Sequence, residues 1–144
     1  MQPDETDWKI INILQKNDVP NNTIAKKLNI SEGTVRVRLK KLKDAGILKV
    51  KALINPEVLE HKQLALVAMR VSESRLLESK AKKVSALESV LSVSIVSGRY
   101  DLVAEVLVDS NRGLVKFLTE ELPHVEGILY SESYLMLKTY NKFV

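Results

Sequence analysis

Hydrophobic residues at helical spacing dominate the first third of the chain. Between Thr6 and Gln15 apolar side chains return every three or four positions, which predicts an amphipathic helix. The polar stretch 17–22 interrupts this pattern, and either Asn21 or Asn22 is expected to cap a short second helix. The sequence therefore predicts two helices before residue 29.

A third helix is expected to begin after Ser31, its N-terminal cap, and to run to about Ala45, where Gly46 ends it. The spacing i, i+4, i+7 predicts its buried face, which consists of Val35, Leu39 and Leu42. The second and third helices are joined by a tight turn at residues 29–30. Two short helices connected in this way form a helix-turn-helix.

The rest of the chain alternates predicted strands and helices in the order βαββαβ. Strands are expected over 64–71, 90–96, 102–108 and 128–137, and helices over 74–87 and 111–122. This order is that of the ferredoxin-like plait. The predicted fold class is therefore α+β, with a helix-turn-helix domain at residues 1–48, an extended linker at 49–62 and a ferredoxin-like domain at 63–144.

The strand over 64–71 is apolar on both faces, although a plait covers only one face of its sheet with helices. Left bare, the other face would form an apolar patch larger than is usual for a monomer. A self-complementary homodimer through this open face would cover it. Packing of the N-terminal domain over the sheet is the alternative.

The charge of the chain is concentrated in one segment. The net charge is +4, and residues 26–51 carry nine basic side chains against only two acidic ones. Residues 52–144 carry eleven basic and twelve acidic side chains and are close to neutral. This asymmetry indicates that the basic part of the chain binds a polyanion and that the near-neutral part has a different function. A solvated charged helix face is the alternative.

The residues on the exposed side of the third helix favour binding to a polyanion over a merely solvated helix face. Its small and polar residues come first and its cations follow, as a helix that reads the major groove of DNA requires. The expected DNA-binding residues are Ser31, Glu32, Thr34, Arg36, Val37, Arg38, Lys40 and Lys41. Among them, Arg38 and Lys40 are expected to contact phosphates and Arg36 a base edge. Gly33 either allows close approach to a phosphate or is neutral. The expected partner is double-stranded DNA with a pseudo-palindromic operator.

Several functional classes are disfavoured. With no cysteine, the chain has no disulfide, thiolate zinc site, iron–sulfur cluster or cysteine nucleophile. His61 and His124 are far apart, so we expect no metal site, and without a glycine-rich phosphate loop we expect no cofactor. Because no catalytic constellation is present, the chain is not expected to be an enzyme. The acidic N-terminus and the lack of a long apolar run predict a cytoplasmic protein.

Several stretches resemble the Lrp/AsnC (feast/famine) family of transcription regulators. They are residues 7–15, 24–31 and 35–42, the tripeptide Gly46-Ile47-Leu48, and the loop Gly98-Arg99-Tyr100-Asp101-Leu102. The resemblance implies that the plait dimerises, that dimers assemble into a higher oligomer such as an octamer, and that a free amino acid binds between dimers. It implies effector-binding roles for Gly98, Tyr100 and Asp101 and for the hydroxyl pair Ser131 and Ser133. The chain departs from the family pattern at Val19-Pro20 and at Glu132.

The residues themselves are compatible with such a pocket. A zwitterion needs an acceptor for its ammonium group, which Asp101 can supply, and donors for its carboxylate, which backbone N–H groups of a glycine turn can supply. Alternatively, residues 97–101 are only a hairpin turn in which Gly98 provides a positive φ.

Three alternative functions remain open at this point. One is an enzyme on a ferredoxin-like scaffold, which turnover of an amino acid would reveal. Another is an effector sensor whose helix-turn-helix mediates protein contacts, which the absence of salt-dependent DNA binding would favour. The third is a regulator with no small-molecule effector.

Overall fold

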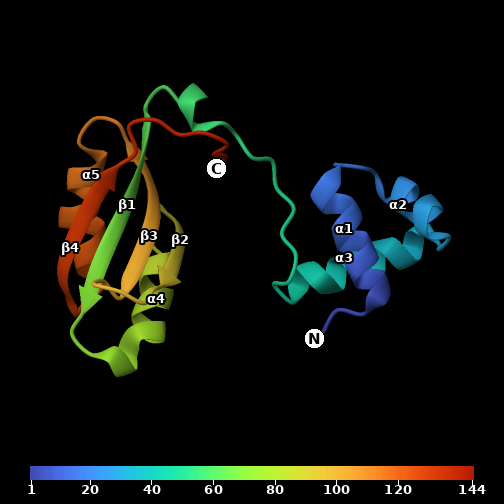
Figure 1. Ribbon diagram of the computed structural model, residues 1–144, viewed down its shortest axis with the longest axis horizontal. Coiled ribbons are helices and arrows are strands. Elements are labelled where there is room, and N and C mark those ends of the chain that lie inside the picture. Colours follow the sequence, from blue (N-terminus) through green and yellow to red (C-terminus); the bar gives the residue numbers. More distant parts are fainter. The chain divides into compact units, whose positions relative to one another are not determined.

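The computed structural model describes residues 1–144, and the chain divides into two compact units, Met1–Ala52 and Leu53–Val144. The first unit contains three helices, α1 (Glu5–Lys16), α2 (Asn21–Leu28) and α3 (Glu32–Asp44). The second contains a four-stranded sheet with helices (Figure 1). The predicted α+β fold class, a helix-turn-helix followed by a ferredoxin-like domain, is confirmed.

Local caps define the ends of the helices in the first unit. Asp4 accepts the backbone N–H of Asp7 (2.8 Å), and the Asp7 carboxylate accepts the N–H of Asp4 (3.0 Å), which is a capping box at the start of α1. The expectation that Asn21 or Asn22 caps α2 is wrong. Pro20 occupies the cap position in an extended conformation, and its carbonyl accepts the N–H groups of residues 23 and 24.

The turn and the ends of α3 follow the prediction. Asn29 ends α2 in the left-handed region (φ 54°), and the Ser31 hydroxyl accepts the N–H of Thr34 (3.0 Å) at the start of α3. Gly46 has φ +67°, and the N–H of Ile47 reaches back to the carbonyl of Leu42 (2.9 Å), which closes the helix. The predicted inner face of α3, Val35, Leu39 and Leu42, is buried.

The sheet of the second unit has the antiparallel order β2-β3-β1-β4. Its strands are β1 (Lys62–Val71), β2 (Val90–Ile95), β3 (Leu102–Asp109) and β4 (Ile128–Leu135), and its helices are α4 (Leu77–Ser85) and α5 (Gly113–Lys116). Both helices lie on the same side of the sheet (Figure 1). Val84, Phe117 and Leu122 pack there against alternate residues of β1 and β3.

The two helical segments of this unit differ from the prediction. A 3-10 turn at Ser74–Leu76 precedes α4, and α5 widens into a π-type turn at Phe117–Glu121 and then tightens into a 3-10 turn at Leu122–His124. A single α-helix over 111–122 is therefore wrong. Pro123 lacks an N–H and its ring would collide with the preceding turn of an α-helix, so the backbone must change its winding before this residue.

The face of the sheet opposite to the helices is partly covered by the chain itself, a cover that the sequence did not predict. Residues 136–144 turn back after β4, and Lys142 Nζ contacts Glu105 Oε2 (2.6 Å) on that face. Val144 and Ile54 exchange two backbone hydrogen bonds (2.8 and 3.0 Å). The chain's own C-terminal segment thus covers part of the open face. Large apolar side chains stay exposed on this segment and on β4, namely Leu129, Tyr130, Tyr134, Leu137, Tyr140 and Phe143. None of the helices combines the length and the apolar character needed to cross a bilayer.

Candidate nucleic-acid and effector sites

The outer side of α3 is open to solvent along its whole length. Because Val35, Leu39 and Leu42 are turned into the core, the intervening positions face outward. Seven of the eight expected DNA-binding residues are exposed: Ser31, Glu32, Thr34, Arg36, Val37, Lys40 and Lys41. The structure therefore gathers these seven on one surface of one helix.

The first turn of this surface is polar and ordered by hydrogen bonds. The Ser31 and Thr34 hydroxyls lie 2.8 Å apart, in addition to the capping bond from the Thr34 N–H. Ser31 therefore has a structural role at the helix start. Glu32 approaches Arg36 at 3.8 Å, and both side chains are more than half exposed, so this pair holds Arg36 only weakly.

The lysines that follow are free cations. Lys40, Lys41 and Lys43 are exposed and form no ion pair within the chain. Their ammonium groups can therefore meet phosphates without giving up an internal partner. Lys43 lies on the same side as the expected site residues and extends the surface by one turn.

Arg38 differs from the expectation of a free phosphate-binding cation. Its Nη1 donates to Asp4 Oδ2 (2.6 Å) and to Asp7 Oδ1 (2.8 Å), and its side chain is only 29% exposed. Hydrogen bonding to Arg38 lowers the pKa of Asp4 below its ordinary value, and hydrogen bonding to Asp4 and Asp7 raises the pKa of Arg38. Arg38 therefore joins α3 to the start of α1 and already has two acidic partners within the chain, whereas its expected contact with a phosphate stays a prediction.

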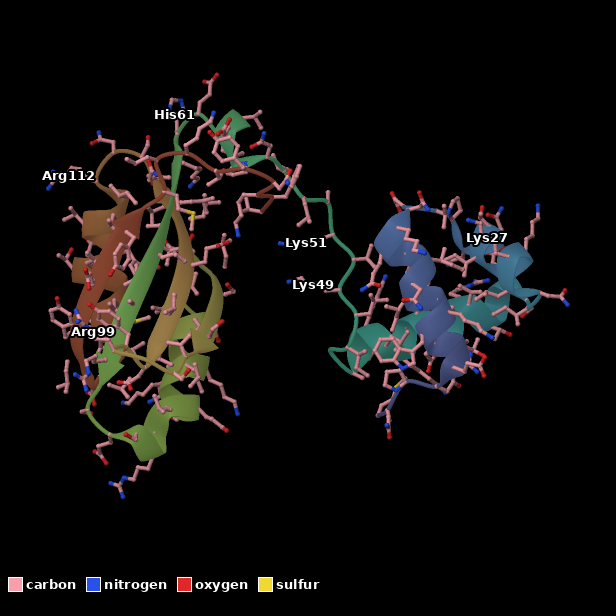
Figure 2. All side chains as sticks on the ribbon, viewed as in Figure 1. Lys27, Lys49, Lys51, His61, Arg99 and Arg112 are labelled. Atoms are coloured by element: carbon pink, nitrogen blue, oxygen red, sulfur yellow. The ribbon has the colours of Figure 1, made fainter.

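Further exposed cations lie in the same unit. Lys26 and Lys27 lie on α2, and Lys49 and Lys51 lie on the segment that follows α3. Figure 2 shows the side chains of Lys27, Lys49 and Lys51 extending away from the backbone. Sequence reasoning counted these residues in the basic stretch but did not place them in the site. Their positive charge was the only feature of the sequence that could have indicated a role in DNA binding.

The expected effector loop connects β2 and β3. Gly98 has φ +154°, so the predicted positive φ is confirmed. Asp101 accepts the N–H of Val71 on one carboxylate oxygen (2.9 Å), and its own N–H donates to the carbonyl of Met69 (2.9 Å). Asp101 therefore anchors the loop to β1, and one carboxylate oxygen remains for another partner.

Tyr100 is held by an aromatic neighbour on β4. Its ring stacks on that of Tyr130, with the ring centres 6.1 Å apart and the planes 8° from parallel. Tyr130 pairs with Arg70 of β1, which places the stack on the face opposite to the helices. On the same face of β4, a hydrogen bond with Glu132 raises the pKa of Tyr134 above its ordinary value.

The structure does not bring Ser131 and Ser133 to this loop within one chain. They pair with Met69 and Val67, whose side chains belong to the core under the helices. Since neighbouring residues of a strand point to opposite faces, the serine side chains and the Tyr130 ring are on opposite sides of the sheet. Ser131 borders a cavity of about 340 Å³ next to residues 118–130.

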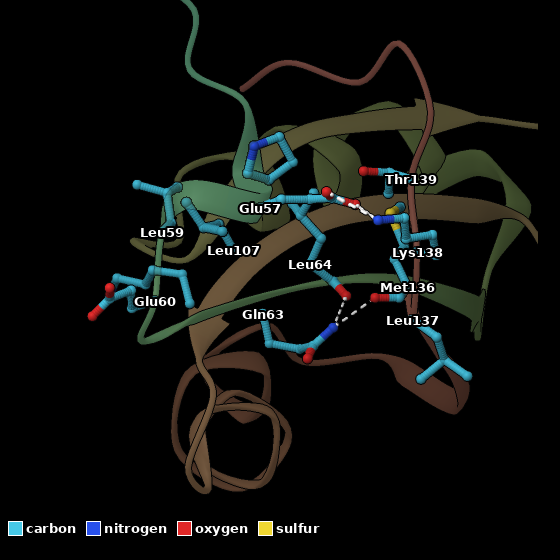
Figure 3. A pocket seen from close by; sticks show the side chains of 12 residues that line it. Glu57, Leu59, Glu60, Gln63, Leu64, Leu107, Met136, Leu137, Lys138 and Thr139 are labelled. Carbon is cyan, nitrogen blue, oxygen red and sulfur yellow. Dashed lines mark hydrogen bonds and ion pairs between the residues drawn. The ribbon is translucent and has the colours of Figure 1, made fainter.

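Another cavity, of about 240 Å³, lies between residues 56–64 and 136–139 (Figure 3). Glu57 and Lys138 form an ion pair across it (3.0 Å), and Gln63 Nε2 donates to the carbonyls of Leu64 and Met136. These polar groups satisfy one another, so they fasten the C-terminal segment to the sheet.

His61 and His124 are both exposed.

Comparison with known proteins connects both units to one family. Residues 3–49 match a model described as winged helix-turn-helix DNA-binding, although this unit contains no β-strand. Residues 64–143 match the model of the Lrp/AsnC ligand binding domain, which is more than half of the chain. The chain belongs to the Lrp/AsnC family. It is a transcriptional regulator with a helix-turn-helix DNA-binding domain and a ligand-binding domain.

Individual relatives of this Lrp/AsnC regulator match over nearly its whole length. The HTH-type transcriptional regulator FL11 of Pyrococcus abyssi is 32% identical and covers 96% of this chain and 92% of its own. LrpA of Mycobacterium tuberculosis shares the fold, with a TM-score of 0.82, 24% identity and coverage of 97% and 96%. A Neisseria meningitidis regulator, solved as a complex with L-Met, has a TM-score of 0.71, 25% identity and coverage of 98% and 94%.

Proposed function

We propose that this Lrp/AsnC regulator binds a specific pseudo-palindromic DNA operator as a two-fold dimer, with one α3 in each major-groove half-site. The observation that carries the proposal is the outer face of α3. Its exposed small and polar residues come first, and the unpaired Lys40, Lys41 and Lys43 follow. In such an arrangement the N-terminal residues contact base edges and the cations contact phosphates. Regulation rather than catalysis is the proposed role, and the cytoplasm is the proposed location.

Alanine variants of the lysines test this assignment. Lys40→Ala and Lys41→Ala should each weaken binding to duplex DNA and reduce the slope of log affinity against log salt by about one unit. Lys83→Ala on α4 removes an exposed lysine from the other unit and is the matched control. Arg36→Ala should change the preferred base at one position of each half-site. Unchanged affinity and slope in both lysine variants would refute the assignment.

We also propose that a free amino acid binds at the loop Gly98–Asp101. The second carboxylate oxygen of Asp101 would accept the ammonium group, the loop N–H groups would bind the carboxylate, and Tyr100 would form a wall. The complex of the Neisseria relative with L-Met supports an amino acid as the ligand class. Since Ser131 and Ser133 face away from this loop, they would enter the site only from another subunit. The effector site would therefore lie at an oligomer interface.

Calorimetric titration with the common amino acids tests the effector proposal. Asp101→Asn keeps an oxygen for the Val71 N–H but removes the charge, so it should abolish binding while the loop stays anchored. Gly98→Val should also abolish binding, because a β-branched residue resists the φ of +154°. Wild-type protein that binds none of the amino acids would be a regulator without an effector, and the DNA-binding proposal would stand.

The exposed apolar side chains of β4 and the C-terminal segment support self-association. Leu137 is 91% exposed and Tyr140 is 84% exposed, which is costly for a monomer in water. We expect a homodimer that assembles into a higher oligomer such as an octamer, with residues 49–62 as the hinge between the domains. Light scattering after size exclusion would show a larger mass than that of one chain. Replacing Leu137 and Tyr140 with serine should lower that mass.

A further inference from the structure

One apolar side chain of α3 does not join the core. Val35, Leu39 and Leu42 are buried, whereas Val37 is 55% exposed between charged neighbours. A valine also has a lower helix propensity than the charged and polar residues that usually fill such positions. Neither packing nor helix formation requires a valine at this position, and we therefore consider which groups surround it on the helix surface.

Gly33 lies one helical turn before Val37 and is not required by packing. A Cβ built at Gly33 would meet only Ser31 Oγ, at an unstrained 3.8 Å, and the backbone has no positive φ. Glycine inside a helix is less stable than alanine, because the unfolded chain has more backbone freedom at glycine. The fold would therefore be more stable with alanine, and the missing side chain leaves a notch beside Val37.

The notch belongs to a hollow of about 720 Å³ on the surface of the first unit. One wall of this hollow consists of Ser31 and residues of α3, and the other consists of Met1, Gln2, Asp4 and Asp7. The residues of α3 are Gly33, Thr34, Val37, Arg38 and Lys41. The two acidic residues on that side, Asp4 and Asp7, are both bound by Arg38. The hollow therefore does not present free carboxylates to a polyanion, and Lys41 stands at its edge as a free cation.

We propose that Val37 and the Gly33 notch read the 5-methyl group of a thymine in the major groove. Thymine is the one base that presents an apolar group there, and apolar side chains are its usual partners. The notch lets the base edge approach the helix backbone, and the two valine methyl groups supply the contact. This inference rests on the proposed DNA-binding function and adds the identity of the base that α3 recognises.

A pair of duplexes that differ only in the methyl group tests the inference. Full-length wild-type protein first selects duplexes from a random-sequence DNA pool. The selected duplexes are then copied with either thymine or uracil, and affinities are measured by fluorescence anisotropy at fixed salt. Burial of one methyl-sized group is worth about 0.8 kcal/mol, so wild type should bind the thymine duplex about fourfold more tightly for each methyl contacted.

Val37→Ala should bind the thymine and uracil duplexes equally well, because it lacks the methyl groups that make the contact. Val115→Ala removes an equally exposed valine from α5 and should keep the wild-type ratio. Gly33→Ala should raise the unfolding temperature and yet weaken binding to the thymine duplex. This combination separates a contact with DNA from damage to the fold.

The possible outcomes distinguish failure of the thymine inference from failure of the proposed DNA-binding function. If wild type selects duplexes but Val37→Ala keeps the wild-type thymine-to-uracil ratio, the inference is overturned and the DNA-binding proposal stands. The same conclusion follows if Gly33→Ala binds the thymine duplex as tightly as wild type does. If wild type selects no duplex at all, the proposed function fails and the inference fails with it.

Discussion

Replacing Arg38 with methionine should destabilise the first unit and leave the phosphate contacts of α3 intact. The guanidinium bridges Asp4 and Asp7, and Asp7 is the one buried charged residue of the chain, with a side chain only 5% exposed. Without Arg38 the Asp7 carboxylate keeps a single internal hydrogen bond, from the N–H of Asp4 (3.0 Å). Methionine preserves much of the aliphatic length, so the change removes mainly the charge and the donors.

The expected loss of unfolding free energy lies between two limits. Exposed ion pairs contribute about 0–1 kcal/mol, and breaking a buried pair costs about 3–5 kcal/mol. Because Arg38 is 29% exposed, water can reach the orphaned carboxylate in part, and we expect about 2 kcal/mol. A unit the size of Met1–Ala52 has a total stability of roughly 3–8 kcal/mol. The midpoint temperature should fall by about 8–15 °C.

Trp8 makes this measurement specific to the first unit of the full-length protein. It is the only tryptophan of the chain and it lies on α1, so its fluorescence reports unfolding of this unit. Lys40→Met is the matched control, since it makes the same kind of substitution at an exposed, unpaired cation of the same helix. We expect its stability to stay within about 0.5 kcal/mol of wild type.

A double variant and the salt dependence complete the test. Asp7→Asn added to Arg38→Met removes the unpaired charge and should restore part of the lost stability. Arg38→Met should keep the wild-type salt slope of DNA binding, whereas Lys40→Met should lose about one unit. If the Arg38→Met protein has wild-type stability and its salt slope of DNA binding is reduced by one unit, this reasoning is refuted. Arg38 would then be a residue that contacts a phosphate.

Three further predictions concern protonation and packing. Arg38 lowers the pKa of Asp4 below 3.8, so the stability from this pair is present above about pH 4 and is lost as the pH falls through the lowered pKa. The Trp8-detected stability of wild type should drop in that acid range more steeply than that of Asp4→Asn. Glu132 raises the pKa of Tyr134, so an ultraviolet titration should show this tyrosine ionising late, and Glu132→Gln should bring it back toward 10.0. Phe117→Ala should destabilise the second unit by about 3–5 kcal/mol, seen by circular dichroism, with the Trp8 transition unchanged.

Local signals explain why much of the fold could be predicted. Ser31 and Gly46 act within a few residues of themselves, so the ends of α3 follow from the sequence. The helical spacing of its core residues also determines which side chains face outward, and that is the candidate DNA surface. The ferredoxin-like fold was predicted from the succession of strands and helices along the chain rather than from any single contact.

The sequence analysis did not predict the features that depend on contacts between residues far apart in the chain. Arg38 lies 31 and 34 residues from its two acidic partners, and only the packing of α1 against α3 brings them together. The register of β4 on β1 pairs Tyr130 with Arg70 and Ser131 with Met69, and this register determines which of the two side chains lies on the face that the helices cover. The C-terminal segment is held over the sheet by the ion pair between Lys142 and Glu105, and no local sequence pattern predicts this pair.

Hydroxyl-radical footprinting of a selected duplex tests the central claim, that paired α3 helices read two half-sites, most directly. Wild-type protein should protect two related patches about one helical turn apart, with centres roughly 34–36 Å from each other. Lys40→Ala and Lys41→Ala should need more protein for the same protection, and Lys83→Ala should not. A single unrepeated patch, or protection that does not depend on the α3 lysines, would contradict the account.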